Sequence, residues 1–213
     1  ALWDMDGTLL DSGEYHWLAW RDSLETENYP ISYETFKATF GQRNDTILRG
    51  YFGADLSDAE VARIGDAKEE RYRALVRERG IQLLPGVGEW LARLQAAGFR
   101  QAIASAAPRA NIEALVEVLG VAQFFDAYVG AEDVQRGKPD PQVFQTAAER
   151  VGVPPQRCVV LEDAHAGVEA AHRAGMRAIA VRTSHAGIEA DIVVDTLDQL
   201  PADAFERLLG SME

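Results

Sequence analysis

Two aspartates stand close to the start of the chain, directly after a short apolar run. Asp4 and Asp6 are separated by Met5 and are followed by Gly7 and Thr8. Carboxylates that share one ligand repel each other unless a cation lies among them, and an all-oxygen set of ligands suits Mg²⁺. The stretch therefore predicts a magnesium site near the beginning of the chain.

Other polar residues follow later apolar runs in the same way. They are Ser105, Lys138, Glu162 and Asp163. Ligands of an open parallel sheet bind beyond the carboxyl ends of its strands, so we expect these side chains to meet at one edge of the sheet. Because alternation along a strand sends residues i and i+2 to the same side, Asp4 and Asp6 are expected to face one ligand together.

The elements that must position these residues alternate along most of the chain. Short apolar runs indicate strands at Ala102-Ile103-Ala104, Tyr128-Val129, Val159-Val160-Leu161, Ile179-Ala180-Val181 and Ile192-Val193-Val194. Helical patterns separate them; between Gly86 and Ala97 the apolar residues fall on one helical face. Strands joined by helical crossovers form a parallel sheet with both faces covered. We therefore predict an α/β fold with a doubly wound, Rossmann-like core.

One segment interrupts this alternation. Residues 12–82 contain helical patterns and turn signals but no convincing strand. We expect a core formed by residues 1–11 and 83–213 and an inserted, all-helical cap formed by residues 12–82. Glycines at both borders indicate flexible linkers, and two such linkers make a hinge.

The composition limits the possible partners. The chain has 213 residues, 47% of them hydrophobic, and 34 acidic residues against 21 Lys and Arg give a formal net charge of −13. This is enough apolar material for a sizeable core. The acidity argues against nucleic acid or an anionic membrane as partner. An anionic ligand must then be held by a metal ion or by a few placed cations.

Cysteine use and hydropathy favour a cytoplasmic protein. Cys158 is the only cysteine and lies in an apolar run, which is consistent with core packing in a reducing compartment. No unbroken apolar stretch predicts a membrane span. The sequence begins at Ala1 rather than at Met, so we expect that residues before Ala1 are missing. We further expect a monomer whose partner is a small phosphorylated metabolite.

The chain resembles the haloacid dehalogenase (HAD) superfamily of phosphotransferases over essentially its whole length. The motifs that carry the resemblance occur in the family's order: Asp4-Met5-Asp6-Gly7-Thr8, Ser105, Lys138 and Glu162-Asp163. The resemblance implies that Asp4 is the nucleophile and Asp6 the general acid and later base. It also implies Mg²⁺ bound by the Asp4 carboxylate, the Asp6 carbonyl and Asp163, with Glu162 a direct or water-mediated ligand.

The residue types suit phosphoryl transfer. A carboxylate nucleophile needs no deprotonation and forms an aspartyl phosphate that water can hydrolyse. Asp6 would protonate the leaving alkoxide and then activate the water. Lys138 would offset negative charge, while the Ser105 hydroxyl and loop amides such as that of Ala106 would bind phosphoryl oxygens.

Simpler interpretations of single residues remain beside this one. A calcium loop is excluded, because it needs a Gly and a Glu where the chain has Leu9 and Tyr15. Ser105 could instead cap the helix that follows it. The Glu162-Asp163 pair could likewise cap a helix that begins near Ala164.

The insert holds three candidate substrate-binding residues. Between Ser57 and Arg79 the apolar positions form one helical stripe, and Lys68 lies within it. Its ammonium either snorkels to the edge of the helix or points at an anion. His16 shares a helical face with Trp20, which indicates that it faces inward as a candidate substrate contact. The alternative is an ordinary half-buried histidine. Arg43, the third candidate, precedes a helix start at which backbone amides attract anions.

The insert also resembles the small helical cap of the HAD branch that includes β-phosphoglucomutase and related sugar-phosphate phosphatases. The similarity lies in the segment DSGEYHWLAW, residues 11–20, and in the spacing from Lys68 to Tyr72. It implies that His16, Arg43 and Lys68 contact the substrate.

Two departures from the mutase pattern bear on the reaction. The mutases' Ser-Ala-Ser-Lys loop, which helps to hold a second phosphate, reads Ser105-Ala106-Ala107-Pro108 here, and a Lys-Gly pair common in their cap reads Phe40-Gly41. The sequence therefore favours a Mg²⁺-dependent phosphatase of a sugar or polyol phosphate. A phosphosugar mutase is the alternative. A receiver-like phospho-acceptor module is a third hypothesis, but it would need neither the insert nor Asp6.

Overall fold

The chain folds into two compact units. The computed structural model describes residues 1–40, 42–185 and 187–210. The core unit comprises Ala1–Asp11 and Ile81–Glu213, and the helical unit comprises Ser12–Gly80. No helix in the described ranges has the length and hydropathy needed to cross a bilayer.

The core unit contains a six-stranded sheet in the order β3-β2-β1-β4-β5-β6, in which every neighbouring pair is parallel. The strands are β1 (Leu2–Trp3), β2 (Ala102–Ala104), β3 (Ala127–Val129), β4 (Val159–Glu162), β5 (Arg177–Val181) and β6 (Ile192–Val194). Every later strand predicted from an apolar run is present. The α/β prediction with a doubly wound parallel sheet is therefore confirmed.

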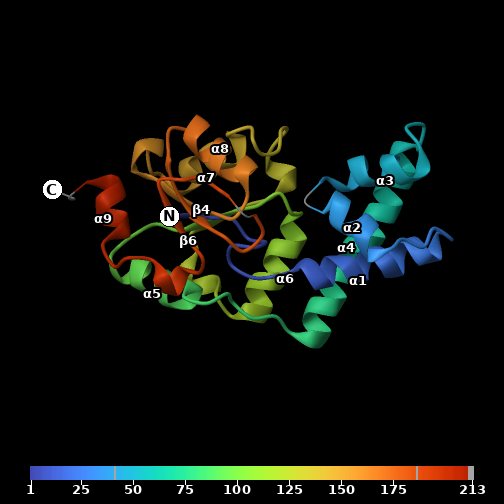
Figure 1. The fold of residues 1–213 in the computed structure, drawn as a ribbon, viewed down its shortest axis with the longest axis horizontal. Helices are drawn as coiled ribbons and strands as arrows, with labels where there is room; N and C mark the ends of the chain where they lie inside the picture. The colour runs from blue at the N-terminus through green and yellow to red at the C-terminus, as the bar shows by residue number, and fades with distance from the viewer. Residues whose placement is uncertain (41, 186, 211–213) are drawn as a thin grey trace. The chain divides into compact units, whose positions relative to one another are not determined.

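Helices connect the strands and cover the sheet. They are α5 (Val87–Ala96), α6 (Arg109–Leu119), α7 (Gln142–Val151), α8 (His165–Arg173) and α9 (Ala204–Leu209), with short 3₁₀ turns η1 (Ala122–Phe124), η2 (Ala131–Asp133), η3 (Pro155–Arg157) and η4 (Leu197–Gln199). Helix α7 packs against β1, β2 and β3, and α8 packs against β4 and β5. In Figure 1 these two helices lie above the strands, and α5 lies below them.

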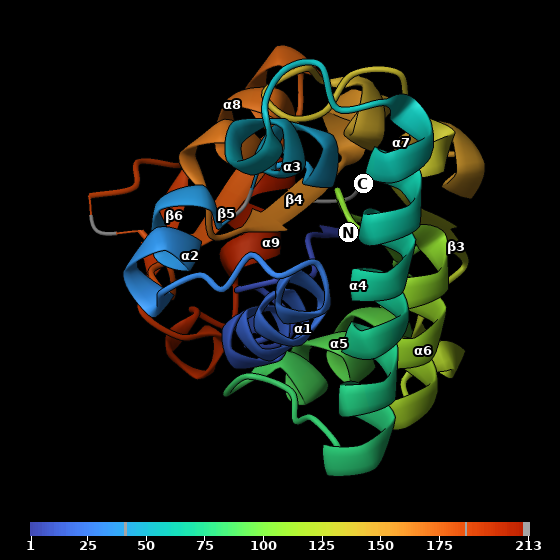
Figure 2. The same ribbon diagram turned by 90° about the vertical axis from the view of Figure 1, so that its right-hand side faces the viewer.

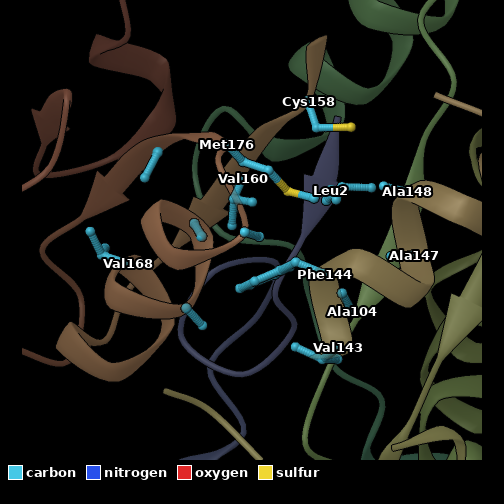
Figure 3. Packing of buried hydrophobic residues seen from close by; sticks show 14 of the residues in the cluster. Leu2, Ala104, Val143, Phe144, Ala147, Ala148, Cys158, Val160, Val168 and Met176 are labelled. Atoms are coloured by element: carbon cyan, nitrogen blue, oxygen red, sulfur yellow. The ribbon is translucent and has the colours of Figure 1, made fainter. Parts of the chain in front are cut away.

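Apolar side chains on both faces of the strands explain this layering. Leu2 and Val160 lie in one buried cluster with Phe144 of α7 and Val168 of α8, as Figure 3 shows. Strands that are buried on both faces consist of consecutive apolar residues, and this is why they could be predicted from the sequence. On the opposite face, the indole of Trp3 donates a hydrogen bond to the side chain of Gln101.

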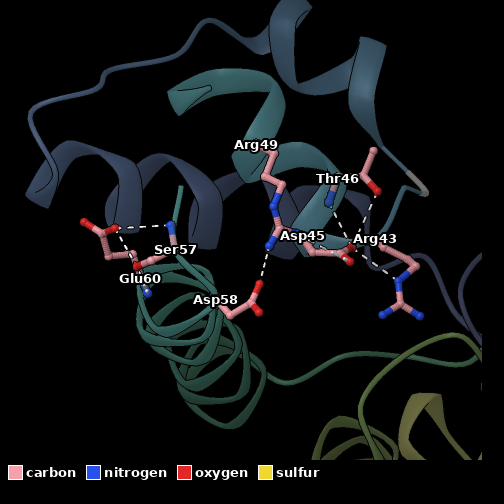
Figure 4. Close-up of polar contacts among 7 residues, drawn as sticks. All are labelled: Arg43, Asp45, Thr46, Arg49, Ser57, Asp58 and Glu60. Carbon is pink, nitrogen blue, oxygen red and sulfur yellow. Dashed lines mark hydrogen bonds and ion pairs between the residues drawn. The ribbon is translucent and has the colours of Figure 1, made fainter. Parts of the chain in front are cut away.

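The helical unit consists of α1 (Gly13–Thr26), α2 (Tyr33–Thr39), α3 (Asn44–Phe52) and α4 (Asp58–Arg79). Figure 2 shows α1 beside the long α4. Ser57 begins α4 with a capping box: its hydroxyl accepts the Glu60 amide, and the Glu60 carboxylate accepts the Ser57 amide (Figure 4). Over residues 12–40 and 42–80 there is no strand, as predicted.

The expectation that strand alternation places Asp4 and Asp6 on one side is wrong. Strand β1 ends at Trp3, so Asp4 and Asp6 lie beyond it and strand alternation does not place them. Instead the chain turns at once. The Gly7 amide donates to the Leu10 carbonyl over 2.7 Å, and Asp6 forms an isolated bridge with Leu10. A tight turn therefore positions Asp6.

Asp191 ties the loop before β6 to β5 and α8 in the core unit. Its carboxylate accepts hydrogen bonds from the Ala178 amide at 2.8 Å and from Arg177 at 2.9 Å, and it lies 3.0 Å from His172 Nε2. Burial opposes ionisation of Asp191. The hydrogen bonds from Ala178, His172 and Arg177 outweigh burial, so its pKa lies below the ordinary value.

We expect Asp191→Asn to lower the free energy of unfolding by about 1–3 kcal/mol at pH 7, because charged hydrogen bonds are lost. A carboxyl group with a lowered pKa stabilises the fold above its unfolded pKa, and the stabilisation is lost as the pH falls through the folded pKa. The difference from the wild type should therefore shrink below about pH 4. Urea denaturation at several pH values measures it. Asp195→Asn, an exposed aspartate paired with Arg182, is the control and should change stability little. A difference that grew at low pH would contradict the assignment.

Candidate active site

The parallel register of β1 and β4 brings the first acids together. Trp3 pairs with Leu161, and the Asp4 amide donates to the Leu161 carbonyl over 2.9 Å. Asp4 therefore lies beside Glu162, the last residue of β4, and Asp163 follows directly. Residues far apart in the sequence meet because both strands end at the same edge of the sheet.

These three acids form a buried cluster. Carboxylate oxygens of Asp4, Glu162 and Asp163 lie within 4.8 Å of one another. Burial raises the pKa of Asp4 well above its ordinary value, and the charges of Glu162 and Asp163 add to the effect. Burial and the charge of Glu162 raise the pKa of Asp163 to about 7. Buried carboxylates this close together repel one another, and a divalent cation among them would offset the repulsion. The cluster is therefore an all-oxygen donor set that suits Mg²⁺.

Lys138 supplies a positive charge to the same cluster. Its ammonium donates to Asp4 Oδ1 and, over 2.6 Å, to Glu162 Oε1. The ammonium lies 4.9 Å from the centre of the Phe144 ring. Burial alone would lower the pKa of Lys138, but the charges of Asp4 and Glu162 outweigh burial and raise it. The lysine is therefore protonated and offsets part of the negative charge.

Glu162 also fixes the loop after β4. Its Oε2 accepts hydrogen bonds from the amides of Asp163 at 2.8 Å and Ala164 at 2.7 Å, while its Oε1 faces the lysine. Both oxygens are thus engaged, which favours the water-mediated alternative over direct metal ligation. A β-carbon at Gly167 would lie 1.8 Å from Glu162 Oε1, so only glycine fits there. Helix α8 begins at His165 with Ala164 as N-cap, so neither acid is the N-cap residue, although Glu162 accepts the amide of Ala164 directly before the helix.

The turn after β1 places Asp6 near Asp163. Gly7 has φ +86°, and a β-carbon there would lie 2.0 Å from Asp163 Oδ2. This close approach and this backbone conformation both require glycine. Burial is the main cause of the raised pKa of Asp163, followed by the charge of Glu162. The charge of Asp6 makes a smaller contribution. Ser184, in the loop after β5, hydrogen-bonds the Asp163 side chain.

Ser105 follows β2 at the same edge of the sheet. It is buried, and its amide donates to the Val129 carbonyl over 3.0 Å. Its hydroxyl accepts the Ala107 amide at 3.0 Å. Helix α6 has Pro108 as its N-cap, so the alternative in which Ser105 caps that helix is wrong. Ala106 lies exposed in the same loop.

In the helical unit the structure brings His16 and Lys68 together. Lys68 Nζ lies 2.9 Å from His16 Nδ1 and donates to Glu69 Oε1 at 2.9 Å. The Tyr72 ring stacks on His16 with centroids 4.2 Å apart. Lys68 is only 2% exposed, so the snorkelling alternative is wrong.

Arg43 has different surroundings. It is the N-cap of α3, where the sequence predicted a helix start. Its side chain is 63% exposed and its Nε donates to Asp45 Oδ1 at 3.2 Å. Phe40, of the pair that departs from the mutase pattern, has its ring 5.9 Å from that of His16. Gly41 lies outside the described residues.

Sequence reasoning missed two residues that contact the candidate site residues. Ser184 carries no motif, and only the fold shows that it reaches Asp163. Glu69 follows Lys68, and charged helix positions are usually solvated. A helical wheel contains a signal, because Glu69 lies three positions before the stripe residue Tyr72.

Comparison with known proteins agrees with this geometry. The family model described as haloacid dehalogenase-like hydrolase matches residues 1–175. Beta-phosphoglucomutase of Bacillus subtilis (strain 168) is 31% identical over 200 residues, which cover 91% of this chain and 88% of the relative. The fructose-1-phosphate phosphatase YqaB of Escherichia coli (strain K12) is 33% identical over 183 residues, covering 85% of this chain and 95% of the relative.

A solved structure shows the same fold. CbbY from Rhodobacter sphaeroides, in complex with xylulose-(1,5)bisphosphate, superimposes with a TM-score of 0.85 at 29% identity, covering 93% of this chain and 94% of that one. The family match, the two relatives and this structure all extend over most of the chain. The chain therefore belongs to the haloacid dehalogenase-like hydrolases.

Proposed function

We propose that this hydrolase is a Mg²⁺-dependent phosphatase of a small phosphorylated metabolite, with a sugar or polyol phosphate as substrate. The observation that carries the proposal is the pairing of Lys138 with both Asp4 and Glu162 inside a buried acidic cluster. The positive charge of Lys138 offsets the negative charge of the carboxylates, so the repulsion between one of them and an anionic phosphate is reduced.

In the proposed reaction an Asp4 carboxylate oxygen attacks phosphorus. The bond from phosphorus to the ester oxygen breaks, and Asp6 gives its proton to the departing alkoxide. Asp6 then takes a proton from water as the water attacks the aspartyl phosphate, which releases phosphate and restores Asp4. The Ser105 hydroxyl, the Ala106 amide and the Lys138 ammonium bind phosphoryl oxygens.

The metal ligands in this proposal are the Asp4 carboxylate, the Asp6 carbonyl and Asp163, with Glu162 acting through water. When bound, Mg²⁺ would offset the charge of the carboxylates and of the phosphate oxygens. Burial raises the pKa of Asp4 and Asp163, and the charges of neighbouring acids add to the effect; a cation at this point would offset that repulsion.

The substrate class rests on the relatives and on the helical unit. One relative is a fructose-1-phosphate phosphatase, and CbbY was solved with a sugar bisphosphate. We propose that His16, Arg43 and Lys68 bind the organic part of the substrate. The mutase alternative is supported by the similarity to beta-phosphoglucomutase. A phosphate-release assay beside an assay for conversion of β-glucose 1-phosphate to glucose 6-phosphate separates the two.

Asp4→Asn should abolish turnover while leaving the fold intact, because an amide is no nucleophile toward phosphorus. We expect kcat for p-nitrophenyl phosphate with Mg²⁺ to fall about 10³-fold or more. The exposed Asp195→Asn serves as control and should keep wild-type turnover. Turnover of Asp4→Asn comparable to that of the wild type would refute the nucleophile assignment.

Removal of Mg²⁺ with EDTA should stop turnover, and added Mg²⁺ should restore it. Asp163→Asn should raise the Mg²⁺ concentration for half-maximal activity about tenfold or more, because a proposed ligand loses its charge. A magnesium titration of both proteins measures this shift. Full activity in EDTA would argue against the metal, and an unshifted titration curve would remove Asp163 from the ligand set.

Lys68→Ala should raise KM for a sugar phosphate about tenfold, since a donor to the organic part is lost, while KM for p-nitrophenyl phosphate changes less. Lys37→Ala removes an exposed lysine of the same unit and is the matched control. Steady-state kinetics on both substrates checks this. An unchanged sugar-phosphate profile would leave Lys68 with a structural role only.

A further inference from the structure

One pair of opposite charges in the helical unit is almost entirely buried. Lys68 is 2% exposed and Glu69 is 6% exposed, and the ammonium donates to Glu69 Oε1 at 2.9 Å. The ammonium also lies 5.3 Å from the centre of the Trp20 ring and 5.7 Å from that of Tyr72. Aromatic walls keep water away from the pair, so each charge depends on the other.

Glu69 is held in place and ionised. Asn44, the first residue of α3, donates its side-chain amide to Glu69 Oε1 at 2.7 Å. Burial alone would raise the pKa of Glu69. The charges of Lys68 and His16 and the hydrogen bonds from Lys68 and Asn44 outweigh burial, so the pKa lies below its ordinary value. Lys68 therefore faces a fixed negative charge at neutral pH.

Arg43 also has a carboxylate partner, but it lies at the surface, with its side chain 63% exposed. Its Nε donates to Asp45 Oδ1, which also accepts the Thr46 amide at 2.9 Å (Figure 4). Arg43 directly precedes Asn44, so the two ion pairs are linked through the start of α3. Each of the two cations in the proposed substrate-binding set thus stands against a carboxylate.

We propose that Glu69 is a specificity-determining residue that restricts the substrates to monophosphates whose organic end carries hydroxyl groups and no second phosphate. The inference rests on the proposed function, in which Lys68 and Arg43 contact the organic part. A second phosphate that approached either cation would also approach the carboxylate beside it. Like charges repel strongly at the buried pair of Lys68 and Glu69, where water is scarce, and more weakly at the exposed pair of Arg43 and Asp45.

A hydroxyl group suits these ion pairs better than a phosphate does. Its oxygen accepts a hydrogen bond from the ammonium or guanidinium, and its O–H donates a hydrogen bond to a carboxylate oxygen. A polyol can therefore bind without separating Lys68 from Glu69. The geometry selects a sugar or polyol by hydrogen bonding and rejects a bisphosphate by charge.

The test compares kcat/KM, from phosphate release by the whole Mg²⁺-loaded protein, for fructose 1-phosphate and fructose 1,6-bisphosphate. Glu69→Gln keeps the shape and removes the charge, and Glu69→Asp keeps the charge. Glu70→Gln makes the same charge change at the exposed neighbouring position of α4 and is the matched control. Turnover of p-nitrophenyl phosphate by every variant reports the chemical step independently.

We expect kcat/KM of the wild type to be about tenfold or more higher for the monophosphate than for the bisphosphate. Glu69→Gln should lower this ratio about tenfold, because KM for the bisphosphate falls. Glu69→Asp and Glu70→Gln should keep the wild-type ratio. If Glu69→Gln does not fold, the wild-type ratio decides alone. A wild type that prefers the bisphosphate, or equal effects of Glu69→Gln and Glu70→Gln, would overturn the inference while p-nitrophenyl phosphate turnover leaves the phosphatase proposal standing. No turnover of any substrate would overturn both.

Discussion

The balance between the Lys138 ammonium and the carboxylates of Asp4 and Glu162 is the constraint on which the core unit depends. A parallel sheet brings its strand ends to one edge, so acids that follow β1 and β4 must lie together. Buried carboxylates at such distances are stable only with positive charge among them. Lys138 supplies one charge directly. The excess of acids over that single lysine is what makes a divalent cation fit the cluster.

Several local features hold this balance in place, and each uses backbone geometry. Glu162 bonds the lysine with one oxygen and the loop amides with the other, so the cation and the loop share one anchor. Gly167 lets α8 come close enough to Glu162 for this arrangement. Gly7 lets the chain turn against Asp163 in a left-handed conformation. A side chain at either glycine would push the acids apart, so the turn and the charge cluster depend on each other.

The architecture could be predicted from the sequence because the burial of side chains in the core follows the periodicity of strands and helices. Strands such as β4 are buried on both faces and show it as unbroken apolar runs, and the stripe of α4 shows its buried side. The position of Asp6 relative to Asp4 was not predictable from strand alternation, because β1 has only two residues and shows no period. Glu69 and Ser184 were missed for another reason. Their importance comes from partners distant in sequence, and neither residue type by itself indicates burial or binding.

The two units balance buried charge in different ways, and this difference supports the different roles that we propose for them. In the core unit the acids Asp4, Glu162 and Asp163 outnumber Lys138, and this excess of acidic groups supports the proposed metal site. In the helical unit the Lys68 ammonium donates to Glu69 beside His16, so this buried cation has a carboxylate against it. A cluster with unbalanced charge binds ions, whereas a balanced pair discriminates among neutral polar groups. In the proposed function the same kind of side chain would serve the chemical step in one unit and substrate choice in the other.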